Sequence, residues 1–379
     1  MPRLKDVIAV LDEMYNPRWA DSWDAVGTVV GDPQAKVSSI LFAVDPVQAV
    51  ADQAVALGVD LIVTHHPLYL KGVTSVAATT PKGRVVHTLA SNGIALHTCH
   101  TNADSPSFGV SESMALALGL SDVRPLEDDL ETTLDSWTVY VPHEAADRVA
   151  EAMHTAGAGQ IGNYDNAQFR SQGEGSFRPL VGANPSIGGV GEVEWVPETK
   201  LELVAPTRIR ETVRAAMRAA HPYEEVAHSV TQQAPAVTGR GSGRLGTLPT
   251  PMNLREFALH VQQSLPGHAG ATRVAGDLDR RIETVALCGG SGDFLLSTAT
   301  TSGADVYVTS DLRHHPVSEH QEEPNACAIV DVPHWAAEST WLPVVARELA
   351  DRLGGTVNTH ISNIVTDPWS LTLTQGAPA

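Results

Sequence analysis

Histidines and acidic residues occur in this sequence at spacings that suit metal ligation, and the first such group is an adjacent pair. His65 and His66 directly follow the apolar, β-branched run Leu61–Thr64 and precede Pro67. Neighbouring residues of an extended chain point in opposite directions, but where a strand ends the backbone turns and both can face one cavity. An isolated pair of this kind is ordinarily two surface imidazoles. The buried strand before it and the proline after it favour metal ligands here.

A second group ends another apolar run, residues 94–99, and contains His100 and Asp104. A carboxylate four residues from an imidazole at a strand end is placed to bind one cation or to bridge two. The alternatives are an aspartate that caps a helix and a histidine buried in the core. Cys99 in the same run is expected to be a buried strand residue and not a thiolate ligand, because no second cysteine lies near it.

The third group is His334 and Glu338. If a helix begins near Pro333, which is favoured in a first helical turn, the two side chains lie at positions i and i+4 of one face. They would then offer a nitrogen and an oxygen to the same metal centre. The alternative is an exposed pair on a solvated helix. Pro343 must kink or interrupt the helix that follows.

A fourth group, Asp311 with His314 and His315, mirrors the first because it also follows an apolar run. It is expected to contact the metal ligands or the substrate, and its alternative is an ordinary surface loop.

Together these groups predict two divalent metal ions per chain, Zn²⁺ or else Mn²⁺ or Fe²⁺. Histidine and carboxylate ligands suit such ions. The five predicted ligands exceed what a single catalytic zinc takes from a protein, whereas two ions ~3.5 to 4 Å apart that share a carboxylate use them all. These ligands are His65, His66, Asp104, His334 and Glu338.

The segments that carry these groups predict an α/β fold. Residues 58–64 and 303–309 resemble each other: each follows a helical segment and runs into one of the polar groups. Further strands are expected at residues 40–44, 94–99, 284–288 and 328–332. Strands that alternate with helices form sheets with crossover connections, whose ligand sites lie beyond the carboxyl ends of the strands. We therefore expect two related α/β lobes around a dinuclear metal site.

The middle of the chain follows another pattern, which predicts an inserted ferredoxin-like α+β domain. Residues 136–141 and 226–230 alternate like strands, and amphipathic helices fit residues 144–155 and the segment that Thr207 opens. Residues 193–204 suggest strand pairs broken at Pro197. The glycine-rich stretch 157–191 is too polar and irregular for core structure, and Gly239–Gly246 is expected to be a hinge. The predicted boundaries are 1–134 for core lobe 1, 135–233 for the insertion and 234–379 for core lobe 2.

Composition narrows the possible partners. The 379 residues carry a net charge of −19, from 44 acidic and 25 basic side chains, with no basic block, which argues against a duplex nucleic acid. A small anionic substrate remains possible because a metal ion inverts the local charge. No run reaches the ~18 apolar residues of a membrane helix, and the first residues do not form a signal peptide. Three scattered cysteines suit a reducing compartment. The prediction is a cytoplasmic protein without a membrane partner.

The motifs resemble those of the dinuclear-metal-centre family, also called GTP cyclohydrolase I type 2 or NIF-three-like. The resemblance covers nearly the whole chain and rests on Trp23–Gly27, Thr64–Pro67, His100–Asp104, His334–Glu338 and, in the middle, residues 157–165, Gly182–Pro185 and His221–Glu225. Ala25 stands where the family usually has Asn, and the Asp311–His315 group also differs from the commonest pattern.

The resemblance implies two α/β lobes with the five ligands named above, and a homohexameric toroid whose active sites face an inner cavity capped by the insertion. It also implies hydrolytic opening of the guanine ring of GTP, which gives dihydroneopterin triphosphate and formate.

The leading hypothesis is therefore metal-assisted hydrolysis of a small molecule such as a nucleotide. His100 or His314 is the candidate proton shuttle, because imidazole titrates near neutral pH. One alternative is a metal-dependent binding or regulatory protein without turnover, in which residues 221–225 sense a ligand. The other is a two-metal phosphoesterase. No Walker A string identifies a phosphate site.

Overall fold

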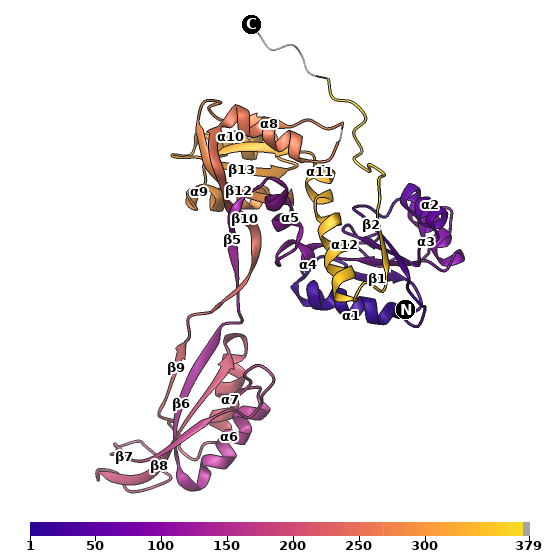
Figure 1. The fold of residues 1–379 in the computed structure, drawn as a ribbon. Helices are drawn as coiled ribbons and strands as arrows, with labels where there is room; N and C mark the ends of the chain where they lie inside the picture. The colour runs from indigo at the N-terminus through magenta and orange to yellow at the C-terminus, as the bar shows by residue number, and fades with distance from the viewer. Residues whose placement is uncertain (268, 374–379) are drawn as a thin grey trace. The chain divides into compact units, whose positions relative to one another are not determined.

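The structure, a computed structural model, describes residues 1–267 and 269–373. It is a mixed α/β protein with three sheets, and it divides into two compact units (Figure 1). Unit 1 comprises Met1–Asp129 and Gly239–Ala379, and unit 2 comprises Leu130–Thr238. The α/β class expected from the sequence is thus present.

The first sheet of unit 1 has five strands in the order β1-β4-β3-β2-β15. Its members are β1 (Gly27–Val30), β4 (Ala95–Thr98), β3 (Leu61–Thr64), β2 (Ser39–Ala43) and β15 (Asn358–Ile361). All neighbours pair in parallel except β1 with β4. Successive residues of β2 and β3 are buried on opposite faces. One face packs against α1 (Leu4–Met14) and α12 (Trp341–Arg352), the other against α2 (Gln48–Leu57) and α3 (Pro81–Ser91).

The second sheet of unit 1 has six strands in the order β11-β14-β13-β12-β10-β5. Its members are β11 (Arg273–Ala275), β14 (Ala328–Val332), β13 (Val306–Ser310), β12 (Arg281–Ser291), β10 (Val237–Asn253) and β5 (Ser121–Leu130). The central strands β12, β13 and β14 are parallel. Apolar residues of α5 (Val110–Ala117), α8 (Leu254–Ser264) and α11 (His334–Ser339) cover one face. α9 (Leu296–Thr301) covers the other face, beside α10 (His314–Glu322).

Each sheet of unit 1 includes a strand from the distant part of the chain. The late strand β15 pairs with β2, and the early strand β5 lies beside β10. One continuous apolar cluster contains side chains from both sheets and from α1, α5, α11 and α12. Figure 1 shows α5, α11 and α12 between the two sheets. This shared layer brings the ends of strands from both sheets together.

Unit 2 is a four-stranded antiparallel sheet in the order β7-β8-β6-β9, with two helices on one face. Its elements follow one another as β6 (Leu134–Pro142), α6 (Ala146–Thr155), β7 (Phe169–Phe177), β8 (Glu194–Pro206), α7 (Arg210–Ala220) and β9 (His228–Gln232). The predicted apolar stripe of α6 is buried against the sheet: Ala146, Val149, Ala150 and Met153. Short 3₁₀ turns, His143–Ala145 and Thr207–Ile209, precede the two helices.

Two local predictions for the middle of the chain were wrong, and a third was right only in part. The glycine-rich stretch lies mostly outside the apolar core, as predicted, but it contains the regular strand β7, which backbone pairing with β8 holds. β8 runs unbroken through Pro197, because β6 ends opposite Glu198 and no strand pairs with Pro197 on that side. The run Gly239–Gly246 is part of the long strand β10 and not a loop. At Gly241 a Cβ atom would lie 2.0 Å from the carbonyl oxygen of Glu127, so glycine allows β5 to approach.

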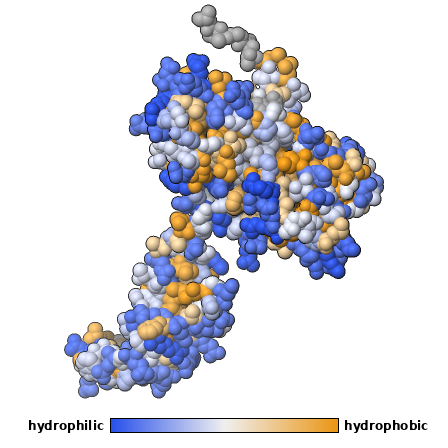
Figure 2. Space-filling model, in the orientation of Figure 1, coloured by the Kyte–Doolittle hydropathy of each residue, from blue (hydrophilic) through white to orange (hydrophobic). Residues whose placement is uncertain are grey.

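No helix of the described residues is both long and apolar enough to cross a membrane. On the face visible in Figure 2, hydrophilic and hydrophobic residues are interspersed.

Candidate metal centre

The predicted ligands lie where strands of both sheets of unit 1 end. His65 and His66 follow β3, and His100 and Asp104 follow β4 through the short helix α4 (Thr101–Asp104). His334 and Glu338 follow β14 on α11, which begins directly after Pro333, as predicted. Helix α11 ends at Ser339 and α12 begins at Trp341. The break falls four residues before Pro343, where the proline ring would meet the Ser339 carbonyl.

The Glu338 carboxylate is the centre of this group. Its Oε1 lies 2.7 Å from Nε2 of His334 and 3.3 Å from Nε2 of His65, and its Oε2 lies 3.1 Å from Nε2 of His66. Asp104 also lies close, with its Oδ1 3.7 Å from Nε2 of His65. The structure thus brings all five predicted ligands together.

The remaining ring nitrogens are fixed by partners outside the centre. Nδ1 of His65 lies 3.0 Å from the carbonyl oxygen of Cys99, which is buried as predicted but directly follows β4 and is not part of it. The other three imidazoles each pair through Nδ1 with an aspartate: His66 with Asp45 at 2.7 Å, His100 with Asp24 at 2.8 Å, and His334 with Asp311 at 2.7 Å. Such pairs set the tautomer and orientation of a histidine, so that its Nε2 is left available to bind a metal ion.

Burial and neighbouring charges together shift the pKa values of His65, Asp104 and Glu338. Burial lowers the pKa of His65, against the opposing effect of Glu338, so the ring stays neutral as a ligand must. Burial also raises the pKa of Asp104 well above its ordinary value, and the charge of Glu338 adds to the effect. For Glu338 burial raises the pKa, but the surrounding imidazoles outweigh it and hold the pKa well below its ordinary value.

The pKa values of the two less buried imidazoles, His66 and His334, are raised instead of lowered. Burial lowers the pKa of His66, but Glu338 and Asp45 outweigh it and raise it to about 10. The pKa of His334 likewise rises to about 11, because Glu338 and Asp311 outweigh burial. Without a cation, protons on these two rings therefore offset the negative charges of Glu338 and of the aspartates that pair with the rings.

A glycine makes room for the centre. Gly290 adopts φ +76°, which favours glycine, and a Cβ atom there would lie 2.6 Å from Oε1 of Glu338 and 3.4 Å from Nε2 of His334. Any larger residue at this position would therefore clash with the Glu338 carboxylate.

The two predicted proton shuttles lie in different surroundings. His100 contributes to a group of three possible donors with His65 and His66, whose ligand atoms lie within 4.8 Å of one another. His314 is exposed at the start of α10, where its ring contacts His315, and belongs to neither donor group of the described residues. The structure therefore places His100, and not His314, at the centre.

Three contributing residues were not assigned a role from the sequence: Asp24, Asp45 and Gly290. Asp45 was detectable, because it follows β2 just as the ligands follow β3 and β4. Asp24 lies in the Trp23–Gly27 motif but in no regular element, so only the fold shows that it reaches His100.

A pocket of about 590 Å³ opens beside the centre within unit 1. Its walls include His66, His334 and their aspartate partners, together with Arg273, Trp335 and Trp369. This volume and this mixture of aromatic and charged side chains suit a small polar substrate.

The donor set fits divalent transition-metal ions. A second donor group of the described residues combines His66, His334 and Glu338, and it shares His66 with the first. Asp104 is about a third exposed, yet its Oδ1 is buried without a hydrogen-bond partner. Oε2 of Glu338 is also buried and lacks hydrogen-bond geometry. Buried carboxylate oxygens without hydrogen-bond partners, close to several imidazole Nε2 atoms, are the surroundings in which a cation can replace the missing partners.

Comparison with known proteins shows the family to which this chain belongs. The chain is a member of the Duf34/NIF3 (NGG1p interacting factor 3) family, whose sequence profile matches residues 2–368. A Mycobacterium bovis protein named GTP cyclohydrolase 1 type 2 homolog is 47% identical over 371 residues, which cover 97% of each chain. A Bacillus subtilis protein of the same name is 37% identical over 370 residues, covering 96% of this chain and 97% of its own. The crystal structure of a Bacillus cereus protein related to NIF3 superimposes with a TM-score of 0.67 at 33% identity, covering 98% and 99% of the two chains.

Proposed function

We propose that the protein is a metal-dependent hydrolase that opens the guanine ring of GTP to give dihydroneopterin triphosphate and formate. Two divalent ions per chain, Zn²⁺ or else Mn²⁺ or Fe²⁺, would be held by His65, His66, Asp104, His334 and Glu338. Bound there, the ions supply a water whose pKa is lowered towards ~7 and polarise the group under attack. The name shared by the bacterial relatives supports this choice of substrate.

One observation carries the proposal: Glu338 lies within 3.3 Å of three imidazole Nε2 atoms, each fixed from behind through Nδ1. Holding three rings in one orientation around a buried carboxylate costs side-chain entropy and buries charge. Apolar side chains in the same place would stabilise the fold without these costs. The arrangement is therefore better explained by cation binding than by a structural role.

The residues around the centre have separate roles in this proposal. His100 moves a proton through Nε2 while Asp24 fixes its Nδ1. The pocket walls orient the substrate, and Trp335 and Trp369 offer aromatic faces to a planar ring. His314 remains the alternative proton carrier only if a movement of α10 brings it to the substrate.

The test combines metal analysis with product analysis of the full-length protein. About two transition-metal ions per chain are expected in the wild type, with loss in His66→Ala and Glu338→Ala. Exposed His87 on α3 provides the matched control His87→Ala. Equal, sub-stoichiometric metal in all four proteins would contradict the metal centre.

The products of GTP distinguish the remaining functions. Release of formate by the metal-loaded protein, lost in His100→Ala and kept in His314→Ala, supports ring opening with His100 as the shuttle. Release of inorganic phosphate instead identifies a phosphoesterase. A metal-loaded protein that binds GTP without forming any product is a binding or regulatory protein.

Three further parts of the proposal concern the whole chain. The order β-α-β-β-α-β of unit 2 supports an inserted ferredoxin-like domain. The family resemblance suggests a homohexamer, for which sedimentation equilibrium is the test. We also propose a cytoplasmic location, which fractionation of cells checks.

A further inference from the structure

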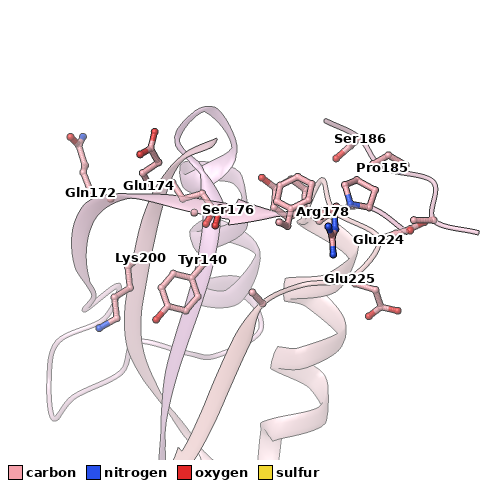
Figure 3. Close-up of a pocket in the computed structure, with 18 of the residues that line it drawn as sticks. Tyr140, Gln172, Glu174, Ser176, Arg178, Pro185, Ser186, Lys200, Glu224 and Glu225 are labelled. Carbon is pink, nitrogen blue, oxygen red and sulfur yellow. The ribbon is translucent and has the colours of Figure 1, made fainter. Parts of the chain in front are cut away.

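Unit 2 contains a pocket of its own, which shares no residue with the metal centre. Its volume is about 640 Å³, within the range of small-molecule sites. It lies on the face of the sheet that α6 and α7 leave uncovered, under the loop of residues 178–186 and beside residues 223–227. Figure 3 shows Lys200 and Tyr140 on one side of the pocket and Arg178 and Glu225 on the other.

Adjacent strands build the floor of this pocket in register. Lys200 of β8 lies opposite Tyr140 of β6 and opposite Ser171 of β7, and Glu198 lies opposite Gly173. Gly173 leaves open space, because a Cβ atom there would meet nothing within 4 Å. At Gly175 a Cβ atom would lie 2.2 Å from Oε2 of Glu198, so the Glu198 carboxylate occupies the place of a side chain.

The motif His221–Glu225 forms one wall. Nε2 of buried His221 donates to the carbonyl oxygen of Tyr140 at 3.0 Å, and its Nδ1 accepts from the backbone N–H of Tyr223 at 3.0 Å. Tyr223 in turn packs edge-on against Phe177, with ring centroids 5.6 Å apart. His221 thus fixes the Tyr223 ring against the sheet, which accounts for this part of the motif.

One polar atom of the wall is left without a full partner. The Tyr223 hydroxyl is buried beside Glu198 but lacks hydrogen-bond geometry to it. Burial and the charge of Glu198 raise the pKa of Tyr223 to about 12, so the hydroxyl keeps its proton. A buried hydroxyl next to a carboxylate is completed by a ligand that donates hydrogen bonds, such as an ammonium group.

The charges on the pocket select the ligand further. Four glutamates and two basic residues line it: Glu174, Glu198, Glu224, Glu225, Arg178 and Lys200. Lys200 pairs with Glu202 at 2.7 Å, whereas no ion pair of Arg178 is found among the described residues. The excess of carboxylates disfavours a nucleotide or another polyanion, and the unpaired Arg178 disfavours a simple cation.

We propose that this pocket binds a small zwitterion of the free amino-acid class. The ligand's ammonium group lies against Glu198 and the Tyr223 hydroxyl, its carboxylate lies against Arg178, and its side chain lies against Phe177 and Tyr140. Unit 2 is then a ligand-binding domain of a protein whose metal centre lies in unit 1.

The experiment uses the full-length protein and the standard L-amino acids, screened by thermal shift at millimolar concentration and followed by calorimetry. The best binder is compared with its decarboxylated amine and its deaminated acid, each of which is expected to bind at least about tenfold more weakly. Arg178→Gln and Glu198→Gln are expected to lose affinity to a similar extent, the first for the carboxylate and the second for the ammonium group.

A steric variant tests the location. Gly173→Leu fills the floor without a backbone clash and is expected to abolish binding. Thr231→Leu, on an exposed position of β9 outside the pocket lining, is the matched control and keeps it. His66→Ala is also expected to bind normally, which separates this proposal from the proposed function of the metal centre.

Three outcomes would overturn the proposal. In the first, no amino acid binds. In the second, the amine binds as tightly as the amino acid and Arg178→Gln has no effect, which identifies a cation site. In the third, Gly173→Leu folds and still binds the ligand. If Gly173→Leu does not fold, the affinities of Arg178→Gln and Glu198→Gln for the ligand decide whether the proposal holds.

Discussion

Pairing between imidazole and carboxylate is the feature of this protein that matters most at the scale of single residues. Three histidines of the candidate metal centre form a hydrogen bond through Nδ1 with an aspartate that is not itself a candidate ligand. The fourth histidine forms its Nδ1 hydrogen bond with a backbone carbonyl oxygen. Because these partners set where each Nε2 points, they should govern metal affinity although they do not bind the metal.

Asp45→Asn is therefore expected to weaken metal binding by roughly 10- to 100-fold, the usual cost of losing such a partner. Asp45 also accepts a hydrogen bond from Thr366, so the change loosens a second contact. Competition with a fluorescent chelator measures the affinity. Asp52→Asn on the exposed surface of α2 is the control. An Asp45→Asn protein with wild-type affinity would show that His66 needs no such support.

The raised pKa values of His66 and His334, about 10 and about 11, predict the pH dependence of metal binding. Below these values both rings carry a proton in the metal-free protein, and a ligand must be neutral. Metal binding near pH 7 should therefore release protons, and apparent affinity should rise as the pH rises towards those values. Calorimetry in buffers of different ionisation enthalpy counts the protons. Affinity that is independent of pH, with no proton release, would contradict this account.

At the scale of elements, the second sheet holds the turn that follows Asp104. Arg244 of β10 is 1% exposed and donates to the carbonyl oxygens of Ser105, Pro106, Gly241 and Gly243 at 2.7 to 2.9 Å. It also lies 3.3 Å from Glu112. One buried guanidinium thus connects β10 to the end of α4.

Arg244→Met is expected to lower the free energy of unfolding by about 3 kcal/mol, because buried carbonyls and Glu112 lose their partner. Urea denaturation measures the loss. Arg255→Met, at an exposed position of α8, should change little. Metal content should fall with Arg244→Met if this turn positions Asp104. Unfolding that matches the wild type would show that the contacts are dispensable.

For the whole molecule, the important feature is that one unit contains all the residues of the candidate metal centre. Every candidate ligand and every partner of a ligand lies in unit 1. The chain leaves this unit through β5 and returns through β10, two neighbouring strands of one sheet. Arg240 and Asp129 lie 3.6 Å apart at that crossing. A short loop therefore suffices to connect the two strands.

Replacing residues 130–238 with such a loop should leave the metal stoichiometry of unit 1 unchanged. The core of unit 2 is a separate apolar cluster, so unit 1 keeps all the side chains of its own core when unit 2 is removed. Elemental analysis beside circular dichroism checks the shortened chain. A folded but metal-free product would show that unit 2 is needed to complete the centre.

The sequence alone was enough to predict the α/β class and the group of side chains that meet at the candidate metal centre. Adjacent and i, i+4 spacings, together with positions at strand ends, are local properties, and they identified His65, His66, Asp104, His334 and Glu338, which the structure brings together. The helical stripe of α6 was predicted for the same reason.

Only the tertiary structure decided what depends on contacts between distant segments. It paired β15 with β2. It brought Asp24 into hydrogen-bond contact with His100 and Asp45 into hydrogen-bond contact with His66, and it left no room for a side chain at Gly290. It made a strand of residues 169–177, whose exposed side chains give little pattern and whose backbone pairs with β8. It also separated His100 from His314, although both are histidines that follow a strand. The spacing of residues along the chain predicts which side chains lie next to one another within a single helix or strand. Which helices and strands lie next to one another depends on tertiary packing.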